Sequence, residues 1–193
     1  MMSGFEYLIA LVSVVAGLSL TRALSGLAKT VHLRGEIRFS AVHLAWTASL
    51  LLWLIDYWWF TFLLAPIEHW TMPLYLFVLI YGATIYFLIA LLFPDNLDSG
   101  FDLFEHFLKS RRWFFGAFLG LGVLDVVDSW TKTYYGVGTP PKGLYSVFIA
   151  TWLLLGIFGV ITASLKYHRA IAFIWLTVVV SFTALFISEG VIV

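Results

Sequence analysis

Four carboxylates stand among the long apolar runs of this sequence: Glu6, Asp56, Asp125 and Asp128. An ionisable side chain at membrane depth is costly, so such a residue marks a candidate functional site. Chains of carboxylates relay protons in many membrane proteins, and rings of them select cations in pores. We therefore expect these four residues to bind a cation or a proton, with Glu189 as a marginal fifth candidate.

Asp125 and Asp128 are three residues apart, a spacing that makes them neighbours on one helix surface. Two carboxylates this close repel each other when both are ionised. They could therefore share one proton or hold a hydrated cation between them. In this hypothesis Asp56 relays the ion inward, and Glu6 shapes the outer mouth of the site.

The composition indicates that lipid surrounds the elements that position these acids. The chain has 193 residues, of which 62% are hydrophobic and 11% charged. A soluble domain carries about 25% charged residues. So much apolar surface cannot be buried in one globule of this length. A hydrocarbon core about 30 Å thick requires about 20 apolar residues of helix. We expect an all-α polytopic membrane protein, a single transmembrane domain over 1–193, with six spans at residues 5–27, 40–65, 73–93, 113–130, 144–165 and 170–188.

Residues 97–109, between the third and fourth spans, are too short and too charged to cross a membrane. Ser99 and Asp102 have the spacing of a capping box, and Phe101, Phe104 and Phe107 fall on one helical face. The segment predicts a short amphipathic helix on the cytoplasmic surface, with its phenylalanines in the lipid boundary.

The basic residues indicate the orientation of the spans, because cytoplasmic loops are rich in Lys and Arg. Nine of the 11 fall on one side, and only Lys132 and Lys142 fall on the other. The richer side is predicted to be cytoplasmic, which places both termini outside, most simply in the periplasm of a bacterial inner membrane. The acids then lie in the outer half of the bilayer. We interpret Arg22, Arg34, Arg38, Arg111 and Arg112 as orientation signals or lipid-headgroup ligands. For Arg22 the alternative is an ion pair with a loop acid such as Asp98 or Asp102.

Small residues predict where helices approach one another, since packing drives association in membranes. In the first span Ser13, Gly17 and Thr21 share a face with Glu6, and in the fourth Gly116 and Gly120 form a GxxxG pair. We expect these faces to lie in helix–helix contacts and the chain to form a homo-oligomer.

Several function classes have no support in the sequence. It has no cysteine and no basic stretch dense enough for nucleic acid. Signatures of enzymes, metal sites and nucleotide loops are also missing. We therefore expect no enzyme activity, no cofactor and no metal, and partners limited to the bilayer, further copies and another protein. The sequence favours a cation or proton channel or transporter subunit. The alternative is a non-conducting scaffold, sensor or accessory subunit that acts through helix–helix and partner-protein contacts.

Overall fold

The structure is a computed structural model that describes residues 3–94 and 97–188. Within these ranges the chain forms six α-helices and one short 3-10 helix, η1. Their bounds are α1 Gly4–His32, α2 Ala41–Thr61, η1 Phe62–Leu64, α3 Met72–Leu92, α4 Leu103–Tyr134, α5 Leu144–Ile161 and α6 Leu165–Ser188. All six α-helices are long and apolar enough to cross a membrane. The all-α prediction with six candidate spans is therefore confirmed.

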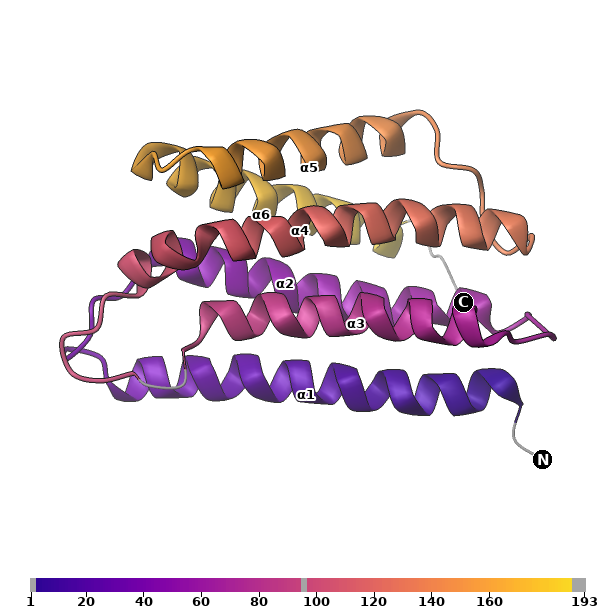
Figure 1. Cartoon of the computed structure of the whole chain (residues 1–193), viewed down its shortest axis with the longest axis horizontal. Helices are drawn as coiled ribbons and strands as arrows, with labels where there is room; N and C mark the ends of the chain where they lie inside the picture. Colours follow the sequence, from indigo (N-terminus) through magenta and orange to yellow (C-terminus); the bar gives the residue numbers. More distant parts are fainter. Residues whose placement is uncertain (1–2, 95–96, 189–193) are drawn as a thin grey trace.

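The helices run alternately up and down, so that successive connections lie at opposite ends of the bundle (Figure 1). The connections α1–α2, α3–α4 and α5–α6 share one end, and the described ends of the chain lie at the other. Arg34 and Arg38 lie in the α1–α2 connection, whereas Lys142 lies in the α4–α5 connection. Most of the basic residues thus lie toward the end of the bundle that holds the α1–α2, α3–α4 and α5–α6 connections.

The structure differs from the prediction at residues 97–109, where the described chain has no separate helix. Asp102 is the N-cap of α4, accepting hydrogen bonds from the N–H groups of Phe104 at 2.9 Å and Glu105 at 3.0 Å. Nothing interrupts the helix after that, so residues 103–109 form the first turns of the 32-residue helix α4. Phe107 is 1% exposed and packs on Trp46, which places it in the core and not at a lipid boundary.

Buried aromatic rings fill the bundle toward the end that holds the α1–α2 connection. Trp46 of α2 makes edge contacts with three phenylalanines of α4, which are Phe114, Phe115 and Phe118. Nearer the middle, the ring of Trp152 in α5 lies 4.8 Å from that of Trp175 in α6. Each of these six side chains is at most 2% exposed. Edge-to-face and offset ring pairs stabilise such a core beyond the area that they bury.

The glycines that bring α4 and α5 together are not the ones that the GxxxG spacing indicates. A Cβ atom added at Gly159 would lie 2.4 Å from the ring of Phe115, so only glycine fits there. At Gly116 and Gly120 the same atom would meet nothing within 4 Å. The predicted pair therefore faces away from the rest of the chain.

The predicted small-residue face of α1 also points outward. Ser13, Gly17 and Thr21 are exposed, although Ser13 accepts a hydrogen bond from the indole of Trp58 at 3.2 Å. The buried face of α1 is instead formed by Leu8, Val12, Ser19, Ala23, Gly26 and Thr30. Spacing alone gives the members of a face but not the direction in which it points.

Three of the five arginines expected at lipid headgroups have partners within the protein. The Arg22 guanidinium donates to the carbonyl of Phe93, at 2.5 Å, where α3 ends without a helical partner for that group. Arg38 lies 3.8 Å from Asp102, and Arg111 donates to the carbonyl of Leu108. Arg22 therefore caps a neighbouring helix, a role that the sequence did not indicate.

Candidate functional site

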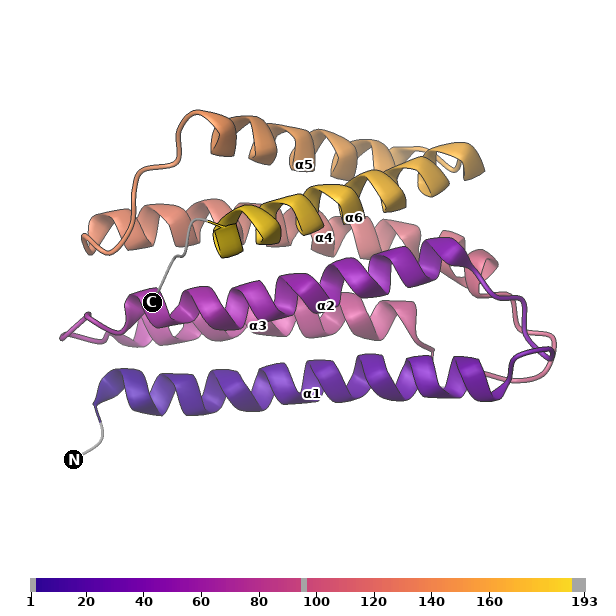
Figure 2. The ribbon, with the colours of Figure 1, turned by 180° about the vertical axis from the view of Figure 1, so that it is seen from behind.

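A cavity of about 1050 Å³ lies between the helices at the end that holds the described chain termini. Its walls come from α2, α3, α4, α5 and α6, together with the connection between α4 and α5. Helices α5 and α6 meet at their shared turn and separate toward this end (Figures 1 and 2). The cavity occupies the region in which they separate.

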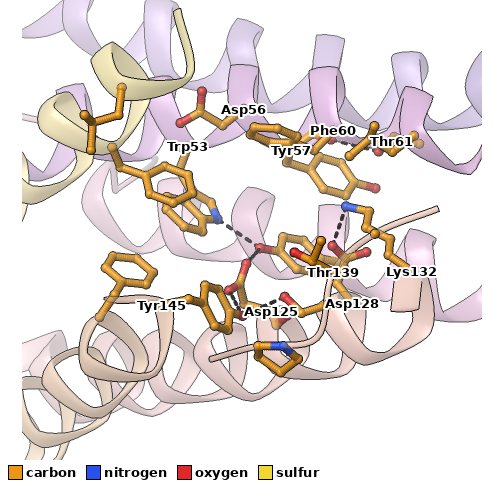
Figure 3. A pocket seen from close by; sticks show the side chains of 18 of the residues that line it. Trp53, Asp56, Tyr57, Phe60, Thr61, Asp125, Asp128, Lys132, Thr139 and Tyr145 are labelled. Atoms are coloured by element: carbon orange, nitrogen blue, oxygen red, sulfur yellow. Dashed lines mark hydrogen bonds and ion pairs between the residues drawn. The ribbon is translucent and has the colours of Figure 1, made fainter. Parts of the chain in front are cut away.

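Three of the four predicted acids line this one cavity. Asp56 lies on one side of it, and Asp125 and Asp128 lie across from it (Figure 3). They come from two helices, α2 and α4, so the sequence-based grouping of these three residues agrees with the geometry.

The fourth acid, Glu6, is exposed and is not part of the cavity wall. Its carboxylate accepts the N–H of Ser3 at 2.7 Å, and its own N–H donates to the Ser3 hydroxyl at 3.2 Å. This reciprocal pair is a capping box that satisfies free donors at the start of α1. Glu6 therefore has a structural role and is left out of the site; Glu189 lies outside the described residues.

Asp125 accepts hydrogen bonds that join several helices. The hydroxyl of Tyr81 in α3 donates to one of its oxygens at 2.9 Å, and that of Tyr145 in α5 donates to the other at 2.6 Å. Tyr81 in turn accepts from the indole of Trp53 in α2 at 3.1 Å. The hydroxyl of Ser129 donates to Tyr145 at 2.8 Å. Because both carboxylate oxygens are bonded, Asp125 is held in one position.

Asp128 is paired with a cation that the chain itself supplies. The Lys132 ammonium lies 2.5 Å from Asp128 Oδ2 and 5.8 Å from the centre of the Phe60 ring (Figure 3). The two side chains are 11% and 21% exposed, respectively. Asp125 and Asp128 thus have different partners, tyrosine hydroxyls for the first and a lysine ammonium for the second.

Asp56 lacks such a cation. It is 8% exposed, and the hydroxyl of Thr183 in α6 donates to its Oδ2 at 2.8 Å. Within the described residues, no lysine, arginine or histidine forms an ion pair with it. A buried carboxylate with one neutral donor is therefore the part of the cavity wall that is least compensated.

Aromatic rings form much of the remaining wall and close the cavity at its inner end. Trp53, Tyr57, Tyr81, Tyr145, Phe148 and Phe182 all line it. Trp53 packs edge-on against Trp152 at 4.9 Å, and the filled aromatic core lies beyond. The expected inward relay from Asp56 therefore meets packed rings in this conformation of the chain.

The outer rim is open and carries a second lysine. Leu144 in α5 is 87% exposed and Leu185 in α6 is 59% exposed, and Lys142 lies in the connection nearby. Of the described residues, three aspartates and two lysines line the cavity, and their charges sum to one net negative charge when all are ionised.

Within residues 3–94 and 97–188, no group of three or more His, Cys, Asp or Glu side chains lies close enough together to hold a metal ion. Three histidines instead bind carbonyls near helix ends: His43 at Leu92, His106 at Leu91 and His168 at Thr162.

Sequence reasoning missed the tyrosines, Lys132 and Thr183. Lys132 follows Asp128 by four residues, the spacing of a helical ion pair, and so could have been found. The contact of Thr183 with Asp56 joins residues 127 positions apart and has no local signal.

Comparison of the chain with protein-family models, with curated proteins and with solved structures gives no match. A function for this chain must therefore be inferred from the geometry of the cavity.

Proposed function

We propose that this chain is a multi-pass protein of a bacterial inner membrane that takes up a cation or a proton from the outer side. The observation that carries the proposal is the convergence of Asp56, Asp125 and Asp128 on one cavity in a bundle of six apolar helices. Carboxylates are kept at membrane depth where they serve binding or transport, because their burial is otherwise unfavourable.

The closed inner end of the cavity favours a transporter, or a subunit of one, over an open pore. A cation that reaches Trp53 from outside meets Trp152 and Trp175 behind it, and both of these rings are at most 2% exposed. Transfer across the bundle then requires a second conformation in which these rings separate, as in alternating access.

Each acid has a distinct role in this proposal. Asp56 receives the incoming charge, since no cationic side chain in the described part of the chain pairs with it. Asp125 fixes the positions of α3, α4 and α5 around the cavity through its two tyrosine hydroxyls. Asp128 and Lys132 set the electrostatic potential in the outer part of the cavity. There the positive charge of Lys132 weakens the attraction of the carboxylates for a further cation.

Flux across liposomes that contain the purified protein tests the proposal. We expect Asp56→Asn to lower the flux of protons, read with an enclosed pH-sensitive dye, or of sodium by at least about tenfold, since the variant removes the uncompensated charge. Glu105→Gln is the matched control, because Glu105 is an exposed acid paired with Lys109 outside the cavity. Equal flux of both ions in wild type and Asp56→Asn would contradict the proposal.

The absence of cysteine allows a direct test of the orientation. Single cysteines at Thr139, in the α4–α5 connection, and at Glu36, in the α1–α2 connection, lie at opposite ends of the bundle. We expect an impermeant maleimide added to whole cells to label Thr139→Cys but not Glu36→Cys. The opposite pattern would place the cavity on the cytoplasmic side.

A second candidate function is that of an accessory subunit that binds other helices. The outward direction of Gly17 in α1 and of Gly116 in α4, each with nothing within 4 Å of an added Cβ, favours it. Such faces allow close approach of a helix from another chain, including a second copy. Native mass spectrometry of wild type and of Gly17→Leu tests this candidate, which predicts an oligomer that the variant loses. A monomer in both cases would remove it.

A further inference from the structure

We propose that the ligand of the cavity is an amphipathic organic cation, an ammonium or phosphonium with apolar substituents, that enters between α5 and α6 from the outer half of the bilayer. This inference rests on the proposed cation-handling function and names the class of cation and its route. It follows from the size of the cavity, the chemistry of its wall and the direction of its opening.

The size of the cavity exceeds what an inorganic ion requires. One water molecule takes up about 30 Å³ in the liquid, so a cavity of about 1050 Å³ corresponds to about 35 waters. Pockets for organic ligands span about 300–1,000 Å³. A proton or a metal ion would leave most of this apolar-walled space to be filled with water, whereas an organic ligand fills it with groups that match the wall.

The wall combines ring faces with carboxylates, the pair of groups that recognises an organic ammonium. Trp53, Tyr57 and Phe148 contribute rings, and Asp56 contributes a charge beside them. Ring faces attract cations and bury alkyl or aryl groups at the same time. A metal ion, in contrast, requires several oxygen or nitrogen ligands at short distance, and the described His, Cys, Asp and Glu side chains form no group of three that could supply them.

The chain already holds an ammonium in this manner. Lys132 Nζ lies between the carboxylate of Asp128 and the ring of Phe60, within the distance at which a cation and a ring attract. Asp56 lies across the cavity, and among the described residues its one side-chain donor is the Thr183 hydroxyl. The geometry therefore assigns Asp56, the carboxylate that no described cationic side chain pairs with, to the charged group of the ligand.

In the proposed membrane orientation, the side of the cavity next to α6 lies at the depth of the hydrocarbon core. Thr177 and Ser181 of α6 line the cavity and are exposed, as is Leu185 farther along. At 1.5 Å per residue, Thr177 and Ser181 lie about 18 and 24 Å from the start of α6, which is within a hydrocarbon core about 30 Å thick. On the opposite side the rim residue is Leu144 of α5. A ligand dissolved among the outer acyl chains can therefore enter without first passing through water, and its apolar groups favour that route.

Equilibrium binding of radiolabelled tetraphenylphosphonium to the purified protein in lipid nanodiscs tests the inference. We expect saturable binding that a hundredfold excess of tetramethylammonium does not displace, because this ion has the charge without the large apolar substituents. Neutral triphenylphosphine oxide should not displace it either. Asp56→Asn should weaken the affinity at least about tenfold, Asp56→Glu should restore most of it, and Glu105→Gln should leave it unchanged. The recovery in Asp56→Glu separates loss of charge from loss of folding.

A matched pair of tryptophan substitutions on α6 tests the route. Ser181→Trp places a large ring in the opening, whereas Val180→Trp places the same ring on an exposed position that does not line the cavity. We expect Ser181→Trp to slow tetraphenylphosphonium association at least about tenfold and Val180→Trp to leave its rate unchanged. Equal rates in the two variants would overturn the lateral route.

The outcomes separate this inference from the function on which it rests. Displacement by tetramethylammonium, or equal displacement by the neutral oxide, would show that the ligand class is wrong. Absence of tetraphenylphosphonium binding together with Asp56-dependent proton or sodium flux would overturn the inference and leave the proposed function standing. Absence of both binding and flux would overturn both.

Discussion

Replacing Lys132 with methionine should tighten the binding of an organic cation while making the protein less stable. Methionine keeps the length of the side chain but removes the ammonium that lies 2.5 Å from Asp128 and 5.8 Å from the Phe60 ring. The formal charge of the described residues that line the cavity then falls from −1 to −2, because three aspartates face one lysine instead of two. The variant is informative because its expected effects on binding affinity and on stability have opposite signs.

The magnitudes follow from Coulomb's law and from the exposure of the pair. Removing the Lys132 ammonium removes its repulsion of the bound cation. For two unit charges about 8 Å apart at an effective dielectric constant of about 20, this repulsion is about 2 kcal/mol, which corresponds to about 30-fold in affinity. Water in the open part of the cavity screens this interaction, so we expect a gain of about 3- to 30-fold. Loss of a partner from a buried ion pair costs about 3–5 kcal/mol. Because the side chains of Lys132 and Asp128 are 11% and 21% exposed, we expect about 1–3 kcal/mol.

Tetraphenylphosphonium binding and thermal unfolding in nanodiscs measure the two effects in the same samples. The double variant Asp128→Asn with Lys132→Met is the control, since it restores the formal charge of −1 and should return the affinity to within about threefold of wild type. If Lys132→Met lowers the affinity, or leaves it unchanged, the carboxylates do not attract the ligand and the electrostatic reasoning is wrong.

Two further predictions concern the packing and the hydrogen bonds that shape the cavity. Gly159→Ala should destabilise the protein by about 1–3 kcal/mol, because the added Cβ would lie 2.4 Å from the ring of Phe115. The control Gly116→Ala should be neutral or slightly stabilising. Thermal unfolding measures both, and equal melting temperatures would contradict the α4–α5 contact. Tyr145→Phe should lower the free energy of unfolding by about 1–3 kcal/mol, because it removes the 2.6 Å hydrogen bond to Asp125. Tyr134→Phe, at an 83% exposed position, should lower it by less than about 0.5 kcal/mol. An equally large decrease in both variants would refute the role given to Asp125.

The six helices could be predicted from the sequence because their signal is local. A segment of about 20 apolar residues satisfies its backbone only as a helix when lipid surrounds it. That requirement does not depend on which neighbours the helix has. The error at residues 97–109 arose from treating charge as a boundary, since Lys109, Arg111 and Arg112 are accommodated within α4.

The direction of each helix face could not be predicted in the same way. In a soluble helix polar residues mark the outside, but a helix in lipid is apolar all round, and small residues are compatible with either side. Gly17 and Gly116 therefore indicated faces that point outward, while Gly159, with no spacing motif, forms the close contact. The same error placed Glu6 in the predicted site, because Glu6 shares the outward face of α1.

The meeting of Asp56 with Asp125 and Asp128 was predicted by their similar depth, which a constant rise per residue makes calculable. Their partners were not, because the bond from Thr183 to Asp56 and that from Tyr81 to Asp125 depend on how α2, α3, α4 and α6 pack. Depth along an axis is available from a sequence, whereas position around the axis requires the assembled bundle.

The position of a bound organic cation shows whether Asp56 binds it. Crystals of the protein soaked with tetraphenylarsonium would locate the arsenic atom by its anomalous scattering. We expect one site inside the cavity, nearer to Asp56 than to any other carboxylate, that disappears in Asp56→Asn crystals. Arsenic found only on the outer surface of the bundle, or a cavity site that persists in Asp56→Asn, would contradict it.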